Sequence, residues 1–361
     1  MRPTGCVRPL EKNDVPRVAE LHSRVFVGSE ASLAGTLTDH LTEIFYRHPC
    51  QDDDLPSLVY EEPDGSITGC LGVIPRPMAM NGSPIRAAIC HNFMVAPGAH
   101  SALAALHLLK TFWRGPQDLS VAEANQAARN IWKGAGGTTA LAYCFRWTRP
   151  LLPAGYLLSL LRARELPAPL ALALGPLCRL ADAVATRVPA SRFRQLRPRG
   201  VAEELTAHTL LAFLPTFVRK RTLHPEYDEA SLDWLFGVLG HTTRRGTLQK
   251  VLLRDEKGEA LGWYLYYSNP HGLGEVVQIG AHEHTVGTVL DHLFYHAWRH
   301  GTVALSGQLD PAYAQALADR YCFFQPGASW IMVHSPRLEV LQPFLRGDAF
   351  FTRLEGESWN I

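Results

Sequence analysis

The chain has 361 residues, of which 47% are hydrophobic and 19% are charged, and its 35 basic and 34 acidic side chains give a net charge of +1. This composition is typical of a soluble globular protein, and the length suggests about two domains of roughly 150 residues each. The even balance of charge excludes a general electrostatic attraction to nucleic acid, which needs clustered basic side chains. We therefore expect no nucleic-acid partner.

The seven cysteines are widely spaced and form no CxxC pair, which favours free thiols in a reducing compartment over a disulfide framework. The first 30 residues contain several acids and lack the apolar run of a secretory signal. Both observations predict a cytoplasmic protein.

The first half of the chain alternates strand and helix signals. A capping residue, Asn13 or Asp14, precedes a helical pattern, and Asp64-Gly65 provides a tight hairpin turn. The expected strands span 4–10, 57–60, 69–74, 85–95, 119–121 and 140–147, and the expected helices follow residue 14 and span 101–113 and 123–133.

Residues 150–195 differ in kind, because prolines punctuate short apolar helical patterns. We interpret them as a helical linker. Their most apolar part, Leu166–Cys178, is too short and too interrupted to span a bilayer, so we expect no transmembrane segment. The pattern favours a helix buried between domains over one that touches a membrane surface.

The second half repeats the order of the first. A hairpin at residues 248–267 turns at Gly258, and an amphipathic helix over 286–298 follows a strand, as the helix over 101–113 does. A strand over 303–306, a helix over 311–319 and a strand over 329–334 complete the series. A divergent duplication accounts for this pattern. It predicts domains at 1–149 and 196–361, joined by the linker at 150–195.

Three segments of the first half resemble the GNAT superfamily of N-acyltransferases. Residues 7–10 with Asp14 are similar to its opening, residues 93–106 to its acyl-CoA loop (V-x-P-x-x-R/Q-G-x-G-x-G/A-x-L), and residues 125–137 to its N-x-x-A-x-x-L-Y-x-x-x-G-F helix. The resemblance implies an α/β (α+β) fold of two GNAT-like domains. Each would be a mixed, mostly antiparallel sheet flanked by helices, with the second domain degenerate.

The second segment has a physical basis of its own. A strand that turns tightly into a helix directs unpaired backbone N–H groups at one place, where a phosphate group of coenzyme A would bind. Ser101 and Leu103 stand at two glycine positions of the family loop, and His100 replaces its Arg or Gln. With the third segment, the resemblance implies these binding residues for acetyl-CoA or another acyl-CoA: Phe93, Met94, Val95, Gly98, Ala99, His100, Ser101, Ala102, Leu103, Ala104, Ala105 and Asn125.

Candidate catalytic residues lie on both sides of that loop. Direct acyl transfer to an amine needs a base, and the resemblance implies one on the strand before the loop, where His91 has a suitable ordinary pKa and Cys90 is a weaker candidate. The family tyrosine that protonates the leaving thiolate is replaced by Trp132, which cannot act as an acid. Tyr143, on the strand expected next, is the substitute candidate, and a core role is the alternative.

Three histidines recur at helical spacing in the second half, at His292, His296 and His300. Two of them could share a metal, but the glutamate of an HExxH motif is missing, and we expect no metal site.

The leading hypothesis is a cytoplasmic N-acyltransferase, specifically an acetyltransferase, that uses acyl-CoA and a small-molecule or peptide amine. One alternative is a transferase of the Fem type, which uses aminoacyl-tRNA, although the even charge argues against a tRNA partner. Another is a pair of degenerate domains that act as a binding or scaffold module.

Overall fold

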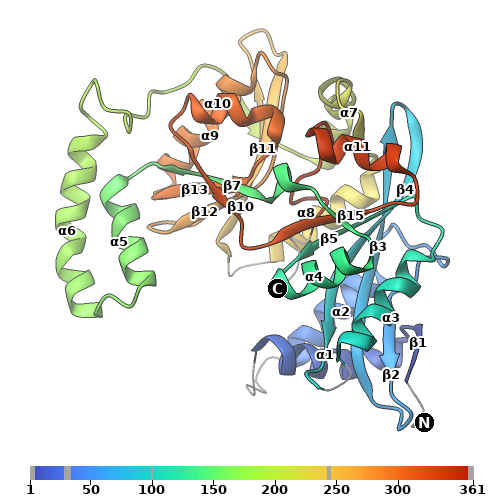
Figure 1. Cartoon of the computed structure of the whole chain (residues 1–361). Coiled ribbons are helices and arrows are strands. Elements are labelled where there is room, and N and C mark those ends of the chain that lie inside the picture. Colours follow the sequence, from blue (N-terminus) through green and yellow to red (C-terminus); the bar gives the residue numbers. More distant parts are fainter. Residues whose placement is uncertain (1–4, 28–33, 99–100, 242–244, 357–361) are drawn as a thin grey trace.

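The structure, a computed structural model, describes residues 5–27, 34–98, 101–241 and 245–356. Two mixed β-sheets with helices packed against them form the body of the molecule, and a pair of helices stands at one side (Figure 1). The expected α/β class with two mostly antiparallel sheets is confirmed. The predictions at Ala99 and His100 lie outside the described residues.

The first sheet is built mainly from the first half of the chain. Its strand order is β1-β2-β3-β4-β5-β15-β6, and among its described strands β4 and β5 pair in parallel and the other neighbours pair antiparallel. The strands are β1 (Cys6–Pro9), β2 (Leu58–Glu61), β3 (Ile67–Met80), β4 (Ser83–Val95), β5 (Leu119–Ala124), β15 (Trp330–His334) and β6 (Thr138–Thr139), and β9 (Leu223–Pro225) also pairs with β3.

The second sheet repeats this plan. Its order is β14-β7-β13-β12-β11-β10-β8, and in the part of the chain that the structure describes β12 and β13 pair in parallel while the other neighbours pair antiparallel. The strands are β7 (Phe145–Pro150), β8 (Val201–Glu204), β10 (Thr247–Arg254), β11 (Ala260–Ser268), β12 (Leu273–Ala281), β13 (Ala304–Gln308) and β14 (Phe323–Pro326). Both hairpins that the sequence predicts are present, with Gly65 and Gly258 at positive φ in their turns.

The two sheets exchange one strand each. β7 precedes the linker but lies in the second sheet, between β13 and β14, and β15 comes from the second half but lies in the first sheet, between β5 and β6. No single cut in the sequence therefore separates the sheets. The domain boundaries expected from the sequence stay a prediction about folding units.

Helices cover both faces of the first sheet. α1 (Val15–His22) and α2 (Ala34–Tyr46) form a core with one face, and α3 (Ser101–Trp113) and α4 (Gln126–Ala135) form a core with the other. The remaining helices are α5 (Pro153–Ala163), α6 (Ala168–Ala185), α7 (Ala207–Val218), α8 (Glu229–His241), α9 (Val286–Arg299), α10 (Ala314–Ala318) and α11 (Leu338–Arg346).

One hydrophobic core joins the two halves. Ile44 of α2 and Ile74 of β3 pack with α7, α8 and Trp263 of β11. Because this core contains residues from both sheets, it fixes the position of one sheet against the other.

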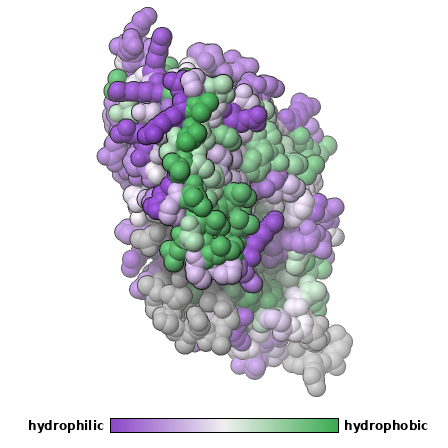
Figure 2. Space-filling model, turned by 90° about the vertical axis from the view of Figure 1, so that its left-hand side faces the viewer, coloured by the Kyte–Doolittle hydropathy of each residue, from purple (hydrophilic) through white to green (hydrophobic). Residues whose placement is uncertain are grey.

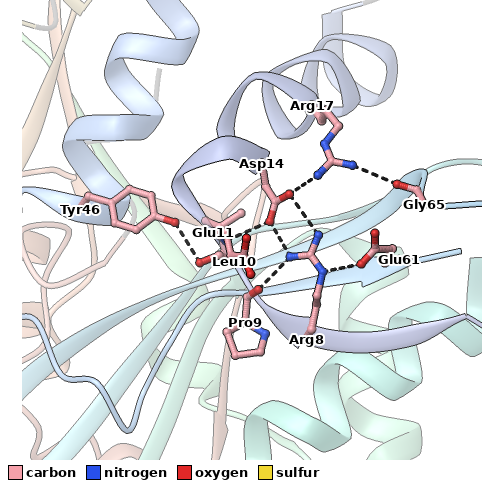
Figure 3. Close-up of polar contacts among 9 residues, drawn as sticks. All are labelled: Arg8, Pro9, Leu10, Glu11, Asp14, Arg17, Tyr46, Glu61 and Gly65. Atoms are coloured by element: carbon pink, nitrogen blue, oxygen red, sulfur yellow. Dashed lines mark hydrogen bonds and ion pairs between the residues drawn. The ribbon is translucent and has the colours of Figure 1, made fainter.

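An ion-pair network fixes the first strand to the first helix (Figure 3). The Arg8 guanidinium binds the Asp14 carboxylate, with 2.6 Å between Nη1 and Oδ2, and also pairs with Glu61 of β2. Arg17 pairs with the same Asp14 carboxylate and donates to the Gly65 carbonyl oxygen in the β2–β3 turn. Asp14 is buried, so its charge is compensated by two arginines rather than by water.

Two expected elements begin at different places. The helix expected from Glu123 begins at Gln126, because the Asn125 side chain caps it and accepts a hydrogen bond of 2.9 Å from the Ala128 amide. Glu123 is therefore the penultimate residue of β5. The strand expected over 140–147 begins at Phe145, and Tyr143 lies in a 3-10 turn, η4 (Leu141–Cys144).

The linker contains helices as expected, α5 and α6, but the expectation that residues 166–178 form a helix buried between the domains is wrong. Few residues of α6 are buried, and Leu172, Leu177 and Leu180 are 73%, 64% and 65% exposed. The two helices pack on each other at the side of the molecule, away from the core that joins the halves (Figure 1).

Candidate active site

The parallel strands β4 and β5 diverge partway along their length. Their paired residues run from Ala87 and Leu119 to Cys90 and Ala122, whereas β4 continues to Val95. A bulge in β4 accompanies the divergence, because the β3–β4 register shifts between Cys70 and Gly72. Asn92 lies in this bulge with a φ of 47°, in the left-handed region.

A cavity of about 180 Å³ opens where the strands part. Its walls come from β4, the end of β5 and α4, and include Cys90, Asn92, Phe93, Glu123, Asn125, Ala128 and Trp132. The lining combines apolar side chains, such as Phe93 and Trp132, with polar ones, such as Glu123 and Asn125, and can therefore bind a ligand that has both kinds of group. Of the residues that the sequence predicts, Cys90, Phe93, Asn125 and Trp132 meet here.

Glu123 stands between this cavity and a second, smaller one. The smaller cavity, of about 20 Å³, is lined by Glu123 together with Ser329 and by Arg146 and Arg353 from the other sheet and its C-terminal segment. The Ser329 hydroxyl donates a hydrogen bond to the Glu123 carboxylate. Sequence reasoning missed Glu123, because it assigned residue 123 to a helix. The available signal was a single acid in the apolar run 119–124.

The N-terminus of α3 lies at the end of β4. The Ser101 hydroxyl donates a hydrogen bond of 3.0 Å to the Gly98 carbonyl oxygen, and the amides of the first helical turn have no acceptor within the helix. Leu103 is 40% exposed, whereas Ala104 and Ala105 are buried against the sheet. Leu103 therefore lies at the surface of the predicted phosphate loop and does not line the cavity. Ala102 is also exposed.

The other residues predicted near the loop face different sides. Val95 packs on the core beneath α3, whereas Met94 is buried in the core beneath α1 and α2. Strand alternation explains this separation, because successive side chains point to opposite faces.

His91 is not in the cavity. It is fully buried, its ring lies 5.3 Å from that of Phe45, and it packs against Gly72, where an added Cβ would come within 2.4 Å of the ring. Burial, with smaller contributions from His48 and His40, lowers the pKa of His91 to about 3. His91 does not line the cavity, and its Nδ1 lies 3.2 Å from Nδ2 of Asn92, which does. A base this weak and this buried is poorly suited to accept a proton there.

Tyr143 has both hydrogen-bonding positions occupied. Its hydroxyl donates to the Ala349 carbonyl oxygen at 2.7 Å and accepts from the Ala349 amide at 2.9 Å. Burial raises the pKa of the Tyr143 hydroxyl, and the side chain packs edge-on against Phe344. These contacts favour the structural role over that of an acid.

The equivalent place in the second sheet is nearly filled. β12 and β13 pair only from Leu273 and Ala304 to Val276 and Gly307, but the cavity beyond them is about 20 Å³. The Tyr313 hydroxyl occupies this region and bonds to both the amide and the carbonyl oxygen of Ala281. The open cavity thus lies in the first sheet.

Two histidines of α9 form hydrogen bonds with tyrosines of β11. The Tyr264 hydroxyl lies 2.8 Å from Nδ1 of His292, and the Tyr266 hydroxyl lies 2.8 Å from Nδ1 of His296. Among the residues that the structure describes, no group of three or more His, Cys, Asp or Glu side chains has a metal-binding arrangement.

No family model and no curated protein matches the sequence. Solved structures do match in fold. A conserved protein from Enterococcus faecalis, described as a probable N-acyltransferase, has a TM-score of 0.60 and 11% identity over 94% of this chain and 74% of its own. A GCN5-related N-acetyltransferase from Anabaena variabilis has a TM-score of 0.60 and 10% identity over 92% of this chain and 73% of its own.

N-myristoyltransferase from Saccharomyces cerevisiae, solved with bound myristoyl-CoA, has a TM-score of 0.55 and 10% identity over 92% of this chain and 78% of its own. These similarities cover both halves of the chain. The fold is therefore GNAT-like in tandem, as the resemblance implied.

Proposed function

We propose that this protein is an N-acyltransferase that transfers an acyl group from an acyl-CoA to an amine. The observation that carries the proposal is the cavity between the diverging strands β4 and β5, which has Glu123 at its inner boundary. The fold shared with N-acyltransferases supports the same class of reaction. The cytoplasmic location expected from the sequence is part of this proposal.

The donor would enter between the strands. Its phosphates would lie at the N-terminus of α3, where helix amides attract an anion, and its thioester would reach the bulge at Asn92. The bulge places the backbone of Asn92 and Phe93 out of register with β3. The N–H groups of these two residues would then be available to the thioester oxygen.

The amine would attack from the side of the smaller cavity. Its nitrogen forms a bond to the thioester carbon, the carbon–sulfur bond breaks, and coenzyme A leaves as the thiolate. Glu123 accepts the proton that the amine loses, and this proton passes to the thiolate or to water. Because the smaller cavity is about 20 Å³, the side chains that line it, such as Arg353 and Ser329, must move aside before an acceptor amine can reach Glu123.

The test is calorimetric titration of the intact protein with coenzyme A, acetyl-CoA and a series of longer acyl-CoAs. We expect binding, and we expect Ala128→Phe to weaken it at least tenfold, because Ala128 lines the cavity. Ala127→Phe is the matched control, since Ala127 is exposed on the same helix. Absence of binding by every acyl-CoA and by free coenzyme A contradicts the proposal.

The acceptor is sought by monitoring free thiol release with a panel of amines and peptides. Turnover with any of them supports transfer. Binding of acyl-CoA without turnover across the panel would favour the scaffold alternative, in which the fold is kept as a binding module.

A further inference from the structure

The exposed helices α5 and α6 form a defined unit, which we call the side hairpin (residues 153–185). Residues 164–167 join its two helices. Asp182 of α6 is buried and accepts hydrogen bonds of 2.8 Å and 2.9 Å from the amides of Ala154 and Gly155 at the start of α5. A carboxylate at a helix N-terminus stabilises this arrangement, so the two helices keep one relative position.

The side hairpin presents an apolar face to the outside. Leu157 of α5 is 57% exposed, and Leu172, Leu177 and Leu180 of α6 are more exposed still. Figure 2, which faces the side where α5 and α6 lie, shows a continuous hydrophobic patch with hydrophilic side chains around it. A patch of this kind on a soluble fold marks a surface for a partner or a membrane.

The surroundings of the patch are strongly basic. Residues 150–200 contain eight arginines, no lysine and two acids, which gives this segment a net charge of +6. Since the whole chain has a net charge of +1, the remainder has −5. Positive charge is therefore concentrated where the apolar side chains are exposed, a combination typical of surfaces that bind anionic lipid.

An arginine-lined cavity of about 410 Å³ lies at the base of the side hairpin. Arg149, four residues before α5, lines it together with Arg192, Arg194 and Arg199, which follow α6. Two acids also line the cavity, and both have partners. Asp291 Oδ1 accepts a hydrogen bond of 2.7 Å from Arg320 Nε, and Asp319 accepts one from the Gln315 amide. We call this space the basal cavity.

Arg149 indicates what the basal cavity can bind. Its side chain is only 5% exposed, and one nitrogen donates to the Arg192 carbonyl oxygen. Nε and Nη1 have no hydrogen-bond partner among the described residues. Buried guanidinium donors without acceptors are costly, and a phosphate oxygen is a matching acceptor.

We propose that the side hairpin and the basal cavity together bind the surface of an anionic phospholipid bilayer. The exposed leucines enter the boundary between headgroups and acyl chains, and a lipid phosphate occupies the basal cavity beside Arg149. Residues just before the hairpin (Arg149) and soon after it (Arg192) both line the cavity, and the proposal places the two features on one docking surface. This binding is independent of the proposed acyl transfer.

The hairpin lies on the bilayer and does not cross it. α6 is the one helix among the described residues that is long and apolar enough to span a membrane by length and composition, which alone is weak evidence. However, α6 carries Arg179 and is fixed through Asp182 to α5, whose 11 residues extend about 16 Å. That length is about half of a bilayer core.

The test is co-sedimentation of the full chain with vesicles of phosphatidylcholine alone or mixed with phosphatidylglycerol. We expect binding to the anionic vesicles, at least tenfold weaker binding to the neutral ones, and weakening as ionic strength rises from about 0.1 M to about 1 M, where the Debye length falls from about 10 Å to about 3 Å. Failure to bind anionic vesicles, or equal and salt-independent binding to both, overturns the proposal.

Two sets of variants locate the binding. Leu172→Gln with Leu177→Gln should abolish it, whereas Leu141→Gln with Leu338→Gln, at leucines exposed elsewhere, should leave it unchanged. Arg192→Gln with Arg194→Gln should reduce it at least tenfold, and Arg114→Gln with Arg346→Gln, also exposed, should not. Circular dichroism checks the fold, and equal vesicle binding by all variants contradicts the assignment.

Two further measurements distinguish a lipid surface from other ligands of the side hairpin and the basal cavity. Inorganic phosphate that binds the protein in calorimetry without any vesicle association indicates a site for a soluble phosphate compound and overturns the proposal. Self-association in light scattering that Leu172→Gln with Leu177→Gln abolishes, again without vesicle binding, assigns the patch to a second copy of the chain and also overturns it.

Discussion

The Ser329 hydroxyl donates a hydrogen bond to the carboxylate of Glu123, although the two residues lie 206 positions apart in the sequence. The contact arises because β15 pairs with β5, so that Trp330 and Ala124 are opposite each other. Ser329, from the second half of the chain, thereby orients Glu123, the candidate base in the first half.

Glu123→Gln should lower kcat/KM for acyl transfer by about 100- to 10,000-fold, because glutamine keeps the shape of the side chain but cannot accept a proton. Acyl-CoA binding measured by calorimetry should stay unchanged. Ser329→Ala should reduce kcat by less and leave KM unaltered, since it only removes a positioning contact.

His91→Gln provides the comparison for that experiment. Because His91 is buried away from the cavity, we expect this variant to keep kcat/KM within a few-fold when it is folded. A loss as large as that of Glu123→Gln would restore His91 as the base and contradict the role of Glu123.

The buried histidines predict loss of stability in acid. Burial lowers the pKa of His48 to about 4 and that of His91 to about 3, against roughly 6.5 in the unfolded chain. Between these values the unfolded state binds more protons, so the free energy of unfolding falls as pH decreases, by about 1.4 kcal/mol per pH unit for each histidine.

Urea denaturation between pH 7 and pH 5 measures this slope. His48→Gln should make it shallower, whereas His208→Gln, at an exposed position, should not change it. An unchanged slope in His48→Gln would show that acid unfolding has another origin.

Asp14→Asn should destabilise the protein by about 2 kcal/mol near neutral pH, since it leaves two arginines without their carboxylate. The hydrogen bonds from Arg8 are the main reason that the pKa of Asp14 is lowered. A carboxyl group with a lowered pKa contributes stability above its unfolded pKa of about 3.9 and loses it as pH falls through the folded value.

The difference in unfolding free energy between the wild type and Asp14→Asn should therefore shrink below about pH 4. Denaturant titrations at several pH values give this difference directly. A difference that is constant with pH would mean that the carboxylate charge does not stabilise the network.

Ser101→Asp should change binding and stability in opposite directions. A carboxylate at the first position of α3 interacts favourably with the helix dipole, by about 0.3–1 kcal/mol, so Tm should rise slightly. The same charge repels the phosphates of coenzyme A, so the Kd for acyl-CoA should increase at least tenfold.

Ser101→Ala is the control, since it removes the hydroxyl without adding charge, and its Kd should stay near that of the wild type. Calorimetry and thermal unfolding measure both effects. If Ser101→Asp binds acyl-CoA normally, the phosphates do not lie at this helix.

Local patterns predicted much of the fold. The helix expected over Ser101–Trp113 has those bounds, and both hairpins turn at the expected glycines, because capping, apolar spacing and turn residues act within a few positions. Asn125 is itself a local signal, because its side chain caps the helix that begins at Gln126. That cap places Glu123 in the preceding strand and not in the helix.

Other features depend on contacts between distant segments. The exchange of β7 and β15 has no signature in either strand alone, and the apolar spacing of α6 is the same whether the helix is buried or exposed. The direction in which His91 points depends on the bulge at Asn92 in β4, which only the pairing with β3 shows.

The exchanged strands also affect the order of events as the chain is made. The first sheet receives β15, the last of its eight strands along the chain, only after residues 330–334 have been synthesised. Until then β5 has an open edge, and the hydrogen bond that orients Glu123 is missing. An N-terminal fragment that ends before β15 would thus contain the cavity residues without the contact that orients Glu123.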